Sequence, residues 1–300
     1  MRALTLDRTD VPLNENLDYY ETRRALADPD TPVDCWGQAT DTRDLNELMD
    51  QVRPLVTRHG VSAIIEPYAG LGSGALTARH LGLDYFGWEV HKKRALIALA
   101  KGFARATDVS PGLAHHDDLI AVGSSRRRHT LENAVLLIIH LLAERFGSTE
   151  LAVEKMCAEL NGLPPPGAGG LVNCRFQGQS VVGCSSPVLF HICPPFPRGA
   201  NASPSEARPP TSMEFLKLID DLSLWLLREV GNEDVVLAEY FNHTAALDVG
   251  IIMAEALLCV CDHATIVVTS RSLPTQPCGF SGFVLARRGA PIEPPKEWLQ

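Results

Sequence analysis

The chain has 300 residues, 45% of them hydrophobic, and a formal net charge of −9. The apolar content excludes a wholly disordered chain, because it is enough to bury a substantial core as one large domain, with or without an insertion. The acidic balance argues against a protein that coats nucleic acid non-specifically, since that affinity comes mainly from neutralising phosphates, although it leaves room for a local basic cleft.

Residues 1–45 are polar, contain scattered prolines and are predicted to form an N-terminal extension. The segment after it alternates between helices and short apolar strands. The predicted elements are a helix over 44–59, a strand over 61–65, a helix over 74–81, a strand over 84–90 and a helix over 93–105. This alternation indicates a parallel sheet with right-handed crossovers.

A helical insertion is predicted to interrupt the alternation over about 108–172. It contains helices over 131–146 and 150–160, and a segment rich in proline and glycine, 163–170, ends it. The later predicted elements are strands over 188–193, 234–241, 264–271 and 282–288 and helices over 212–230 and 244–258. The last two strands are joined by a turn-rich segment, which predicts an antiparallel pair at one edge of the sheet. The sequence thus predicts one α/β domain over 46–288 and a tail over 289–300.

The most informative segment is a glycine-rich turn that follows an apolar strand, Glu66-Pro67-Tyr68-Ala69-Gly70-Leu71-Gly72. Gly70 and Gly72 have no side chain, so a ligand can approach the backbone, and the amides at the start of the next helix can cradle it. Glu89 ends the next apolar run, where an acid can accept both hydroxyls of a ribose. The alternative for Glu89 is a solvated charge at a strand end.

A second turn, Cys193-Pro194-Pro195-Phe196, ends the strand over 188–193. A Pro-Pro pair in isolation is usually a strand terminator. This pair, however, falls where the fourth strand should end, next to the glycine turn at the carboxyl edge of the sheet, which is where open α/β sheets bind ligands. Its position therefore favours a functional turn.

The two turns resemble those of the amino-methyltransferases of DNA, which methylate adenine N6 or cytosine N4. That family carries Asp-Pro-Phe-x-Gly-x-Gly and Asp/Asn/Ser-Pro-Pro-Tyr/Phe, against Glu66–Gly72 and Cys193–Phe196 here. The resemblance covers roughly 62–100 and 186–288. It implies a doubly wound, mostly parallel, seven-stranded Rossmann-like methyltransferase sheet with a closing antiparallel hairpin, S-adenosylmethionine as cofactor, and DNA as partner.

The resemblance also implies roles for single residues. Glu66 and Pro67 begin the cofactor turn, with Glu66 beneath the methionine portion of the cofactor. Tyr68 shapes the pocket. Gly70, Gly72 and Glu89 complete the cofactor site. The adenine ring would meet an acid after the third strand, for which Asp117 and Asp118 are the preferred candidates. The alternative is Gln179, which would make roughly 108–170 an insertion between the second helix and the third strand.

Methylation of an exocyclic amine explains the residue types of the second turn. The amine is a poor nucleophile while its lone pair is delocalised into the ring, so acceptors must hold its protons. The carbonyl of Pro194 can serve and Phe196 can stack on an extruded base, but the Cys193 thiol is only a weak acceptor. His191 shares a strand face with Cys193 and is a possible substitute, the alternative being a satisfied core histidine.

Other readings stay open at this stage. Gly70-x-Gly72-x-x-Ala75 also fits a dinucleotide turn, which would indicate an NAD(P)-binding dehydrogenase. An RNA base amine is an equally suitable substrate, and the Cys193 departure allows a binding subunit that has lost catalysis. The cluster Arg126-Arg127-Arg128, predicted on a loop, could track a phosphate backbone or be a solvated loop.

The cysteines and the apolar stretches of the chain indicate its compartment and whether it binds a metal. Eight cysteines are scattered along the chain and are expected to carry reduced thiols. Cys259, Cys261 and His263 lack the spacing of a zinc site, so no metal is expected. The first residues lack the apolar core of a signal peptide and the apolar stretch 134–143 is too short to cross a bilayer, which makes the cytoplasm the expected location.

Overall fold

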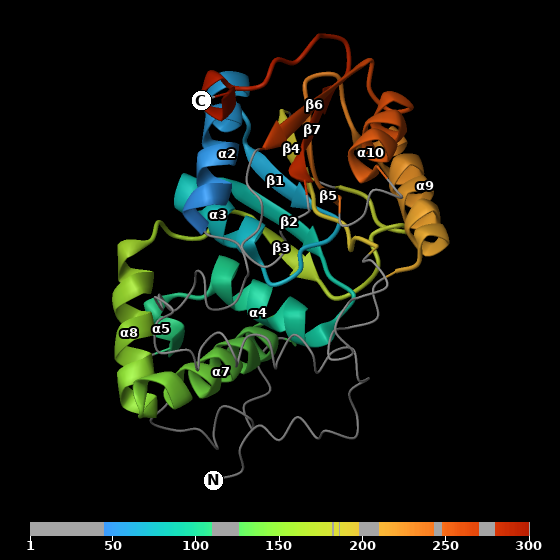
Figure 1. Ribbon diagram of the computed structural model, residues 1–300. Helices are drawn as coiled ribbons and strands as arrows, with labels where there is room; N and C mark the ends of the chain where they lie inside the picture. The colour runs from blue at the N-terminus through green and yellow to red at the C-terminus, as the bar shows by residue number, and fades with distance from the viewer. Residues whose placement is uncertain are drawn as a thin grey trace. The chain divides into compact units, whose positions relative to one another are not determined.

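The computed structural model describes residues 45–109, 126–181, 183–185, 187–197, 210–242, 248–269 and 280–299. Its strands are β1 (Ala63–Glu66), β2 (Asp84–Trp88), β3 (Gly169–Val172), β4 (Val188–Ile192), β5 (Val235–Asn242), β6 (His263–Thr269) and β7 (Phe280–Arg287). They form one seven-stranded sheet in the order β3-β2-β1-β4-β5-β7-β6 (Figure 1). β2–β3, β1–β4 and β4–β5 are parallel pairs, whereas β7 runs antiparallel to both β5 and β6. This is the Rossmann-like methyltransferase topology, and the predicted fold class and closing hairpin are confirmed.

The helices are α2 (Leu45–His59), α3 (Ser73–Leu81), α4 (Lys92–Phe103), α5 (Ala106–Val109), α7 (Arg126–Phe146), α8 (Thr149–Gly162), α9 (Ser212–Glu229) and α10 (Val249–Leu258), with a short 3-10 helix η2 (Lys296–Leu299). The contacts divide the described chain into two compact units. One contains 69–174 with the start of α2, and the other contains 50–68 with 175–299. Each unit is described by itself below.

In the first unit, a helical core surrounds α7. This helix packs against α4 and α8, and α5 packs against α8. The apolar positions of α7 recur at helical spacing and are buried, as the sequence predicts for 131–146; they include Val135, Ile138 and Leu142. α8 begins at an N-cap, where the Ser148 hydroxyl accepts the Leu151 N–H at 3.1 Å. The two predicted helices of the insertion are therefore confirmed.

A buried arginine joins the ends of several elements in this unit. Arg79 of α3 is 3% exposed and donates to the carbonyl of Ala104, at 2.6 Å, and to that of Pro164, at 3.1 Å. These carbonyls follow α4 and α8, so one side chain satisfies the chain at both helix ends. Burial lowers the pKa of Arg79, and the neighbouring Arg105 lowers it further.

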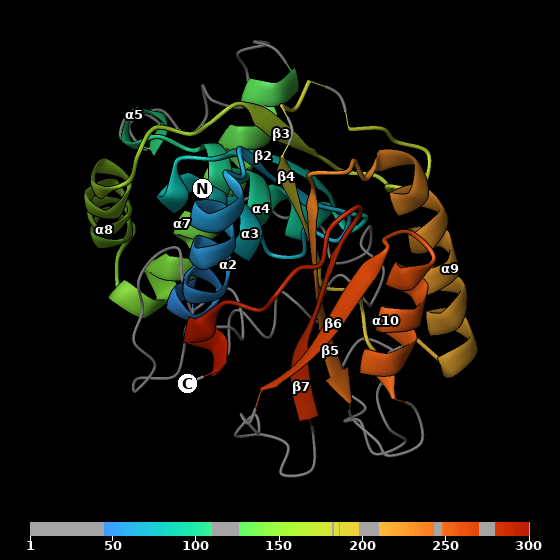
Figure 2. The ribbon, with the colours of Figure 1, turned by 90° about the horizontal axis from the view of Figure 1, so that it is seen from above.

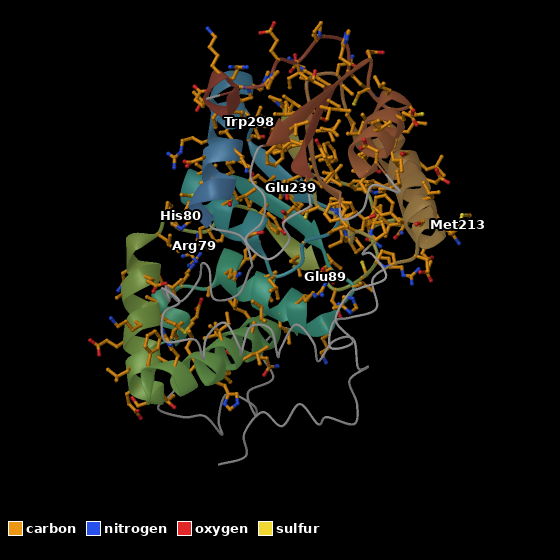
Figure 3. All side chains as sticks on the ribbon, in the orientation of Figure 1. Arg79, His80, Glu89, Met213, Glu239 and Trp298 are labelled. Carbon is orange, nitrogen blue, oxygen red and sulfur yellow. The ribbon has the colours of Figure 1, made fainter. Side chains whose placement is uncertain are left out.

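In the second unit, α9 and α10 lie side by side, and α10 packs against β5, β6 and β7 (Figure 2). α9 is amphipathic: Phe215, Leu222 and Trp225 are buried, whereas Met213 is 74% exposed and projects outward (Figure 3). Its start is a capping box in which the Thr211 hydroxyl accepts the Glu214 N–H, at 3.2 Å, and the Glu214 carboxylate accepts the Thr211 N–H, at 2.8 Å.

A buried aspartate sets the start of two parallel strands in this unit. Asp234, 4% exposed, precedes β5 and accepts the N–H of Val188, the first residue of β4, at 3.0 Å. Its other oxygen accepts the Gly231 N–H at 2.7 Å. The charge is thus satisfied by backbone donors, and it helps to set the register that runs from Leu189–Val235 to Ile192–Ala238.

Two sequence-based expectations need correction. The segment 163–170 was predicted as a linker, but Gly169–Val172 is β3, paired with Tyr85–Trp88 of β2. A strand of two glycines, a leucine and a valine has no alternating pattern, so only its backbone pairing reveals it. The cluster 126–128 was predicted on a loop, but α7 begins at Arg126, in keeping with the good helix propensity of arginine.

Among the residues that the structure describes, no helix is both long enough and apolar enough to cross a membrane.

Candidate functional site

The glycine turn after β1 is held in a conformation that requires glycine. Gly70 and Gly72 have φ angles of +54° and +86°, in the left-handed region. A Cβ on Gly72 would lie 2.5 Å from the Cα of Ala98, whereas a Cβ on Gly70 would meet nothing within 4 Å. Gly72 therefore allows α3 to approach α4 closely, and Gly70 leaves open space beside the turn, as a ligand-binding turn needs.

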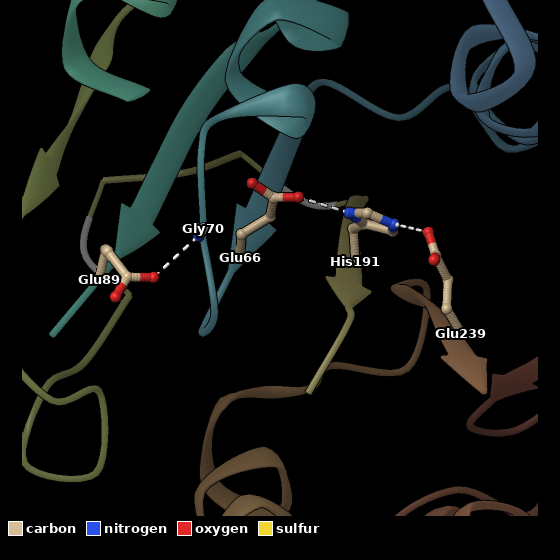
Figure 4. A network of polar contacts seen from close by, with 5 residues as sticks. All are labelled: Glu66, Gly70, Glu89, His191 and Glu239. Atoms are coloured by element: carbon tan, nitrogen blue, oxygen red, sulfur yellow. Dashed lines mark hydrogen bonds and ion pairs between the residues drawn. The ribbon is translucent and has the colours of Figure 1, made fainter. Parts of the chain in front are cut away.

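Glu89 lies just after β2 and fixes this turn. It is 6% exposed, and its Oε2 accepts the Gly70 N–H at 2.9 Å (Figure 4). Its Oε1 accepts the His91 N–H at 2.8 Å. Burial raises the pKa of Glu89, and these backbone hydrogen bonds and His91 oppose the rise. The alternative of a solvated strand-end charge is wrong. Each carboxylate oxygen has a second lone pair, so a ribose hydroxyl can still bind.

Asn173, the residue after β3, binds the backbone at Glu89. The side-chain amide of Asn173 donates to the carbonyls of Glu89, at 2.9 Å, and Val90, at 3.0 Å. It thereby fixes the backbone at Glu89 and at the residue after it. Asn173 cannot be recognised from the sequence, because its role depends on β3, which has no sequence pattern.

The second unit contains a buried chain of three titratable side chains from neighbouring strands. His191 of β4 binds Glu66 of β1 through Nδ1, at 2.5 Å, and Glu239 of β5 through Nε2, at 2.7 Å (Figure 4). The side chains of His191 and Glu66 are 2% and 3% exposed, and that of Glu239 is 11% exposed. Burial lowers the pKa of His191, but the hydrogen bonds and charges of Glu239 and Glu66 outweigh it and raise the pKa to about 9.

At neutral pH His191 is therefore an imidazolium that donates from both nitrogens. It has no lone pair left, so the expectation that it could substitute as an acceptor is wrong, and the alternative of a satisfied core histidine is correct. Glu66 lies at the carboxyl end of β1 and contacts the strand that leads into Cys193. Glu239 was missed, although a single acid inside the apolar run of β5 is a signal that could have revealed it.

The double-proline turn follows β4, as predicted. Cys193 is half-buried, Pro194 is buried, Pro195 is exposed and Phe196 is half-buried. The Phe196 ring lies 6.4 Å from that of Phe215 on α9, with the ring planes inclined by 43°. The turn thus leaves part of an aromatic ring and of a thiol accessible at the carboxyl end of the strand. The six described cysteines, Cys193 among them, form no disulfide.

Tyr68 packs in an aromatic stack within the second unit. Its ring lies 5.1 Å from Phe176, which lies 5.2 Å from Trp225. The Tyr68 hydroxyl is buried and finds no hydrogen-bond partner among the described residues, and burial raises the pKa of this hydroxyl above its ordinary value. A buried polar atom of this kind usually has a partner, so it is suited to a bound ligand or an ordered water.

Of the three candidates for the adenine contact, the structure describes only Gln179. Asp117 and Asp118 lie outside the described residues. Gln179 follows β3, as its alternative requires; its carbonyl accepts the Trp225 indole N–H at 2.8 Å, and its side chain is exposed. Within the described part of the chain, no group of three His, Cys, Asp or Glu side chains is arranged to bind a metal.

No protein-family model and no curated protein matches the chain. Among solved structures, the rRNA methyltransferase AviRa from Streptomyces viridochromogenes has a TM-score of 0.38 and 12% identity, over 88% of this chain and 89% of that chain. The hMettl16 catalytic domain in complex with the MAT2A 3′UTR hairpin 6 has a TM-score of 0.43 and 9% identity, over 85% and 74%. An rRNA methylase from Streptococcus thermophilus has a TM-score of 0.31 and 11% identity, over 79% and 97%. Similarity at this level assigns no function to the chain.

Proposed function

We propose that the chain is an S-adenosylmethionine-dependent methyltransferase that acts on an exocyclic amine of a DNA base, adenine N6 or cytosine N4. The observation that carries this proposal is the buried Glu89 carboxylate on the Gly70 amide, at 2.9 Å. It unites in one contact a glycine turn after the first strand and an acid after the second. The sheet order of the methyltransferase fold supports the same assignment.

The residues present fit the cofactor. The open space beside Gly70 admits a ligand to the backbone, Glu89 offers acceptors for a ribose, and the buried Tyr68 hydroxyl is a polar atom that needs a partner. When bound, S-adenosylmethionine supplies an electrophilic methyl group. The chain's own residues would bind the nucleoside at the turn, stack the target base on Phe196 and accept an amine proton at the Pro194 carbonyl.

The test is transfer of a tritiated methyl group to DNA and RNA pools, by the native chain and by Gly72→Asp and Phe196→Ala. We expect label in DNA, a loss of at least 100-fold with Gly72→Asp because the side chain collides with Ala98, and a loss of about tenfold with Phe196→Ala from lost stacking, worth about 1–3 kcal/mol. Equal incorporation by all three chains contradicts the proposal. Label in RNA alone moves the substrate to an RNA base.

Cys193 favours a second candidate, a binding subunit of the methyltransferase fold that has lost catalysis. Its thiol is a weaker acceptor than the Asp, Asn or Ser that the resemblance leads one to expect at this position. Cofactor binding by the native chain without methyl transfer to any nucleic acid would support this candidate and exclude the first.

A further inference from the structure

The double-proline turn lacks a strong side-chain acceptor for the substrate amine. An aromatic amine becomes nucleophilic only when acceptors hold its protons and localise its lone pair. Cys193 stands where a strong acceptor is expected, and a thiol is a weak one. His191 donates from both nitrogens and so cannot replace it. A methyltransferase built on this chain therefore needs another acceptor near Cys193.

The pairing of β4 and β5 places an acid beside that position. His191 pairs with Leu237 and Ile192 with Ala238 in a parallel register. β4 ends at Ile192 and Cys193 follows it directly, whereas Glu239 follows Ala238 within β5, on a neighbouring strand about 4.8 Å away. Glu239 contacts the ring of His191, which lies two residues before Cys193. Glu239 and Cys193 thus lie at the same end of this strand pair.

Glu239 is also oriented and accessible. Its Oε1 accepts the Nε2–H of His191 at 2.7 Å, and His191 is in turn bound to Glu66, so the carboxylate is held in one position. Its side chain is 11% exposed, against 2% for His191 and 3% for Glu66. Among the three it is the most exposed. One imidazolium between two carboxylates leaves a net negative charge, which favours a developing cationic amine.

We infer that Glu239 is the side-chain acceptor that binds the substrate amine, in place of Cys193, and that His191 and Glu66 are the positioning residues that orient it. This inference rests on the proposed function. The amine nitrogen forms a bond to the methyl carbon as the sulfur–carbon bond breaks, and the sulfur keeps the electron pair. The extra proton on the nitrogen passes to the Glu239 carboxylate and from there to water.

The experiment combines five variants of the full chain: Glu239→Gln, Glu239→Gln/Cys193→Asn, Glu66→Gln, Glu66→Gln/Cys193→Asn and Glu255→Gln. Glutamine at 239 still accepts from His191 but holds amine protons less well. Asparagine at 193 restores a strong acceptor at the original position. Glu255 is exposed on α10, so its variant is the matched control for the same chemical change. The readouts are kcat and KM for methyl transfer, S-adenosylhomocysteine binding by calorimetry, and the thermal midpoint.

We expect Glu239→Gln to lower kcat about 100-fold, the size of a lost acid–base group, with cofactor affinity close to that of the native chain. The thermal midpoint should fall, because His191 loses a charged partner. Adding Cys193→Asn should raise kcat at least tenfold above that of Glu239→Gln. Because Glu66 acts by orienting Glu239, Cys193→Asn should also raise the kcat of Glu66→Gln, and Glu255→Gln should match the native chain.

The inference is overturned if Glu239→Gln keeps native kcat, if Cys193→Asn does not rescue it, or if the loss of rate is accompanied by lost cofactor binding, which would indicate a structural role. In each of these cases the native chain remains active and the proposed function stands. A native chain that transfers no methyl group to DNA or RNA contradicts the proposed function itself.

Discussion

At the scale of single residues, two buried acids at strand ends make different contacts. They are Glu89, which follows β2, and Glu66, which ends β1. Glu89 uses both carboxylate oxygens to order backbone amides, one of them in the glycine turn. Glu66 instead binds an imidazolium, and through it is linked to Glu239. The first arrangement leaves lone pairs at the turn, and the second links three neighbouring strands of the second unit. A triad that is largely buried is strongly sensitive to the loss of any member.

The stability of the chain should depend on the charge of His191. Its folded pKa, about 9, lies above the ordinary value of 6.5. The stabilisation that this shift provides is therefore fully present below pH 6.5 and is lost as the pH rises through 9, up to about 3 kcal/mol in all. We expect the thermal midpoint of the native chain to fall between pH 6.5 and pH 9.5.

Variants isolate this dependence from other titrating groups. Glu66→Gln and Glu239→Gln each remove a charge that raises the pKa of His191, so both should flatten the fall in thermal midpoint between these pH values. Glu255→Gln, on the exposed face of α10, should leave it unchanged. A native slope that persists in both triad variants would mean that His191 is not the charged group.

At the scale of elements, the strands β1, β4 and β5 bring the triad together because they are parallel neighbours. The register Ile65–Phe190 puts Glu66 beside His191, and Ile192–Ala238 puts Glu239 one step further along. These registers are set by buried runs and by the Asp234 carboxylate at the other end of β4. A slip of one residue would turn every side chain of a strand to its other face and would separate the triad.

The helix that follows the double-proline turn depends on its cap. We expect Thr211→Ala to destabilise the chain by about 1 kcal/mol, because the Glu214 N–H loses its acceptor and one half of the capping box is removed. Hydrogen exchange at the amides of Glu214 and Phe215, together with the thermal midpoint, measures the effect. Thr211→Ser should retain most of the protection.

A surface variant in the same turn serves as the control. Met213 is 74% exposed, so Met213→Ala should change neither the exchange rates nor the thermal midpoint. Exchange at Glu214 that is the same in the native chain and in Thr211→Ala would show that the cap contributes nothing.

At the scale of the whole molecule, the alternation of helices with apolar strands predicted a parallel sheet, and the turn-rich segment between the last two strands predicted the closing hairpin. The resemblance of the two turns to those of amino-methyltransferases implied the seven-stranded sheet. The glycine turn, Glu89 and the double-proline turn were also found from sequence, because each combines a special residue with a strand end. β3 was missed since Gly169–Val172 has no periodicity. Asn173 and Glu239 were missed because their contacts join residues far apart in the chain, to Glu89 and to His191. Such partners follow from strand order and register, which one sequence does not contain.

The most direct test of the account is calorimetric titration of the chain with S-adenosylhomocysteine, beside NAD and NADP. The native chain should bind S-adenosylhomocysteine and neither dinucleotide. Gly72→Ala should lose that binding, since a Cβ there would lie 2.5 Å from the Cα of Ala98, whereas Gly82→Ala, at a similar φ of +68° with open space around it, should keep it. Binding of a dinucleotide in place of S-adenosylhomocysteine, or S-adenosylhomocysteine affinity that is the same in Gly72→Ala and the native chain, would contradict the account.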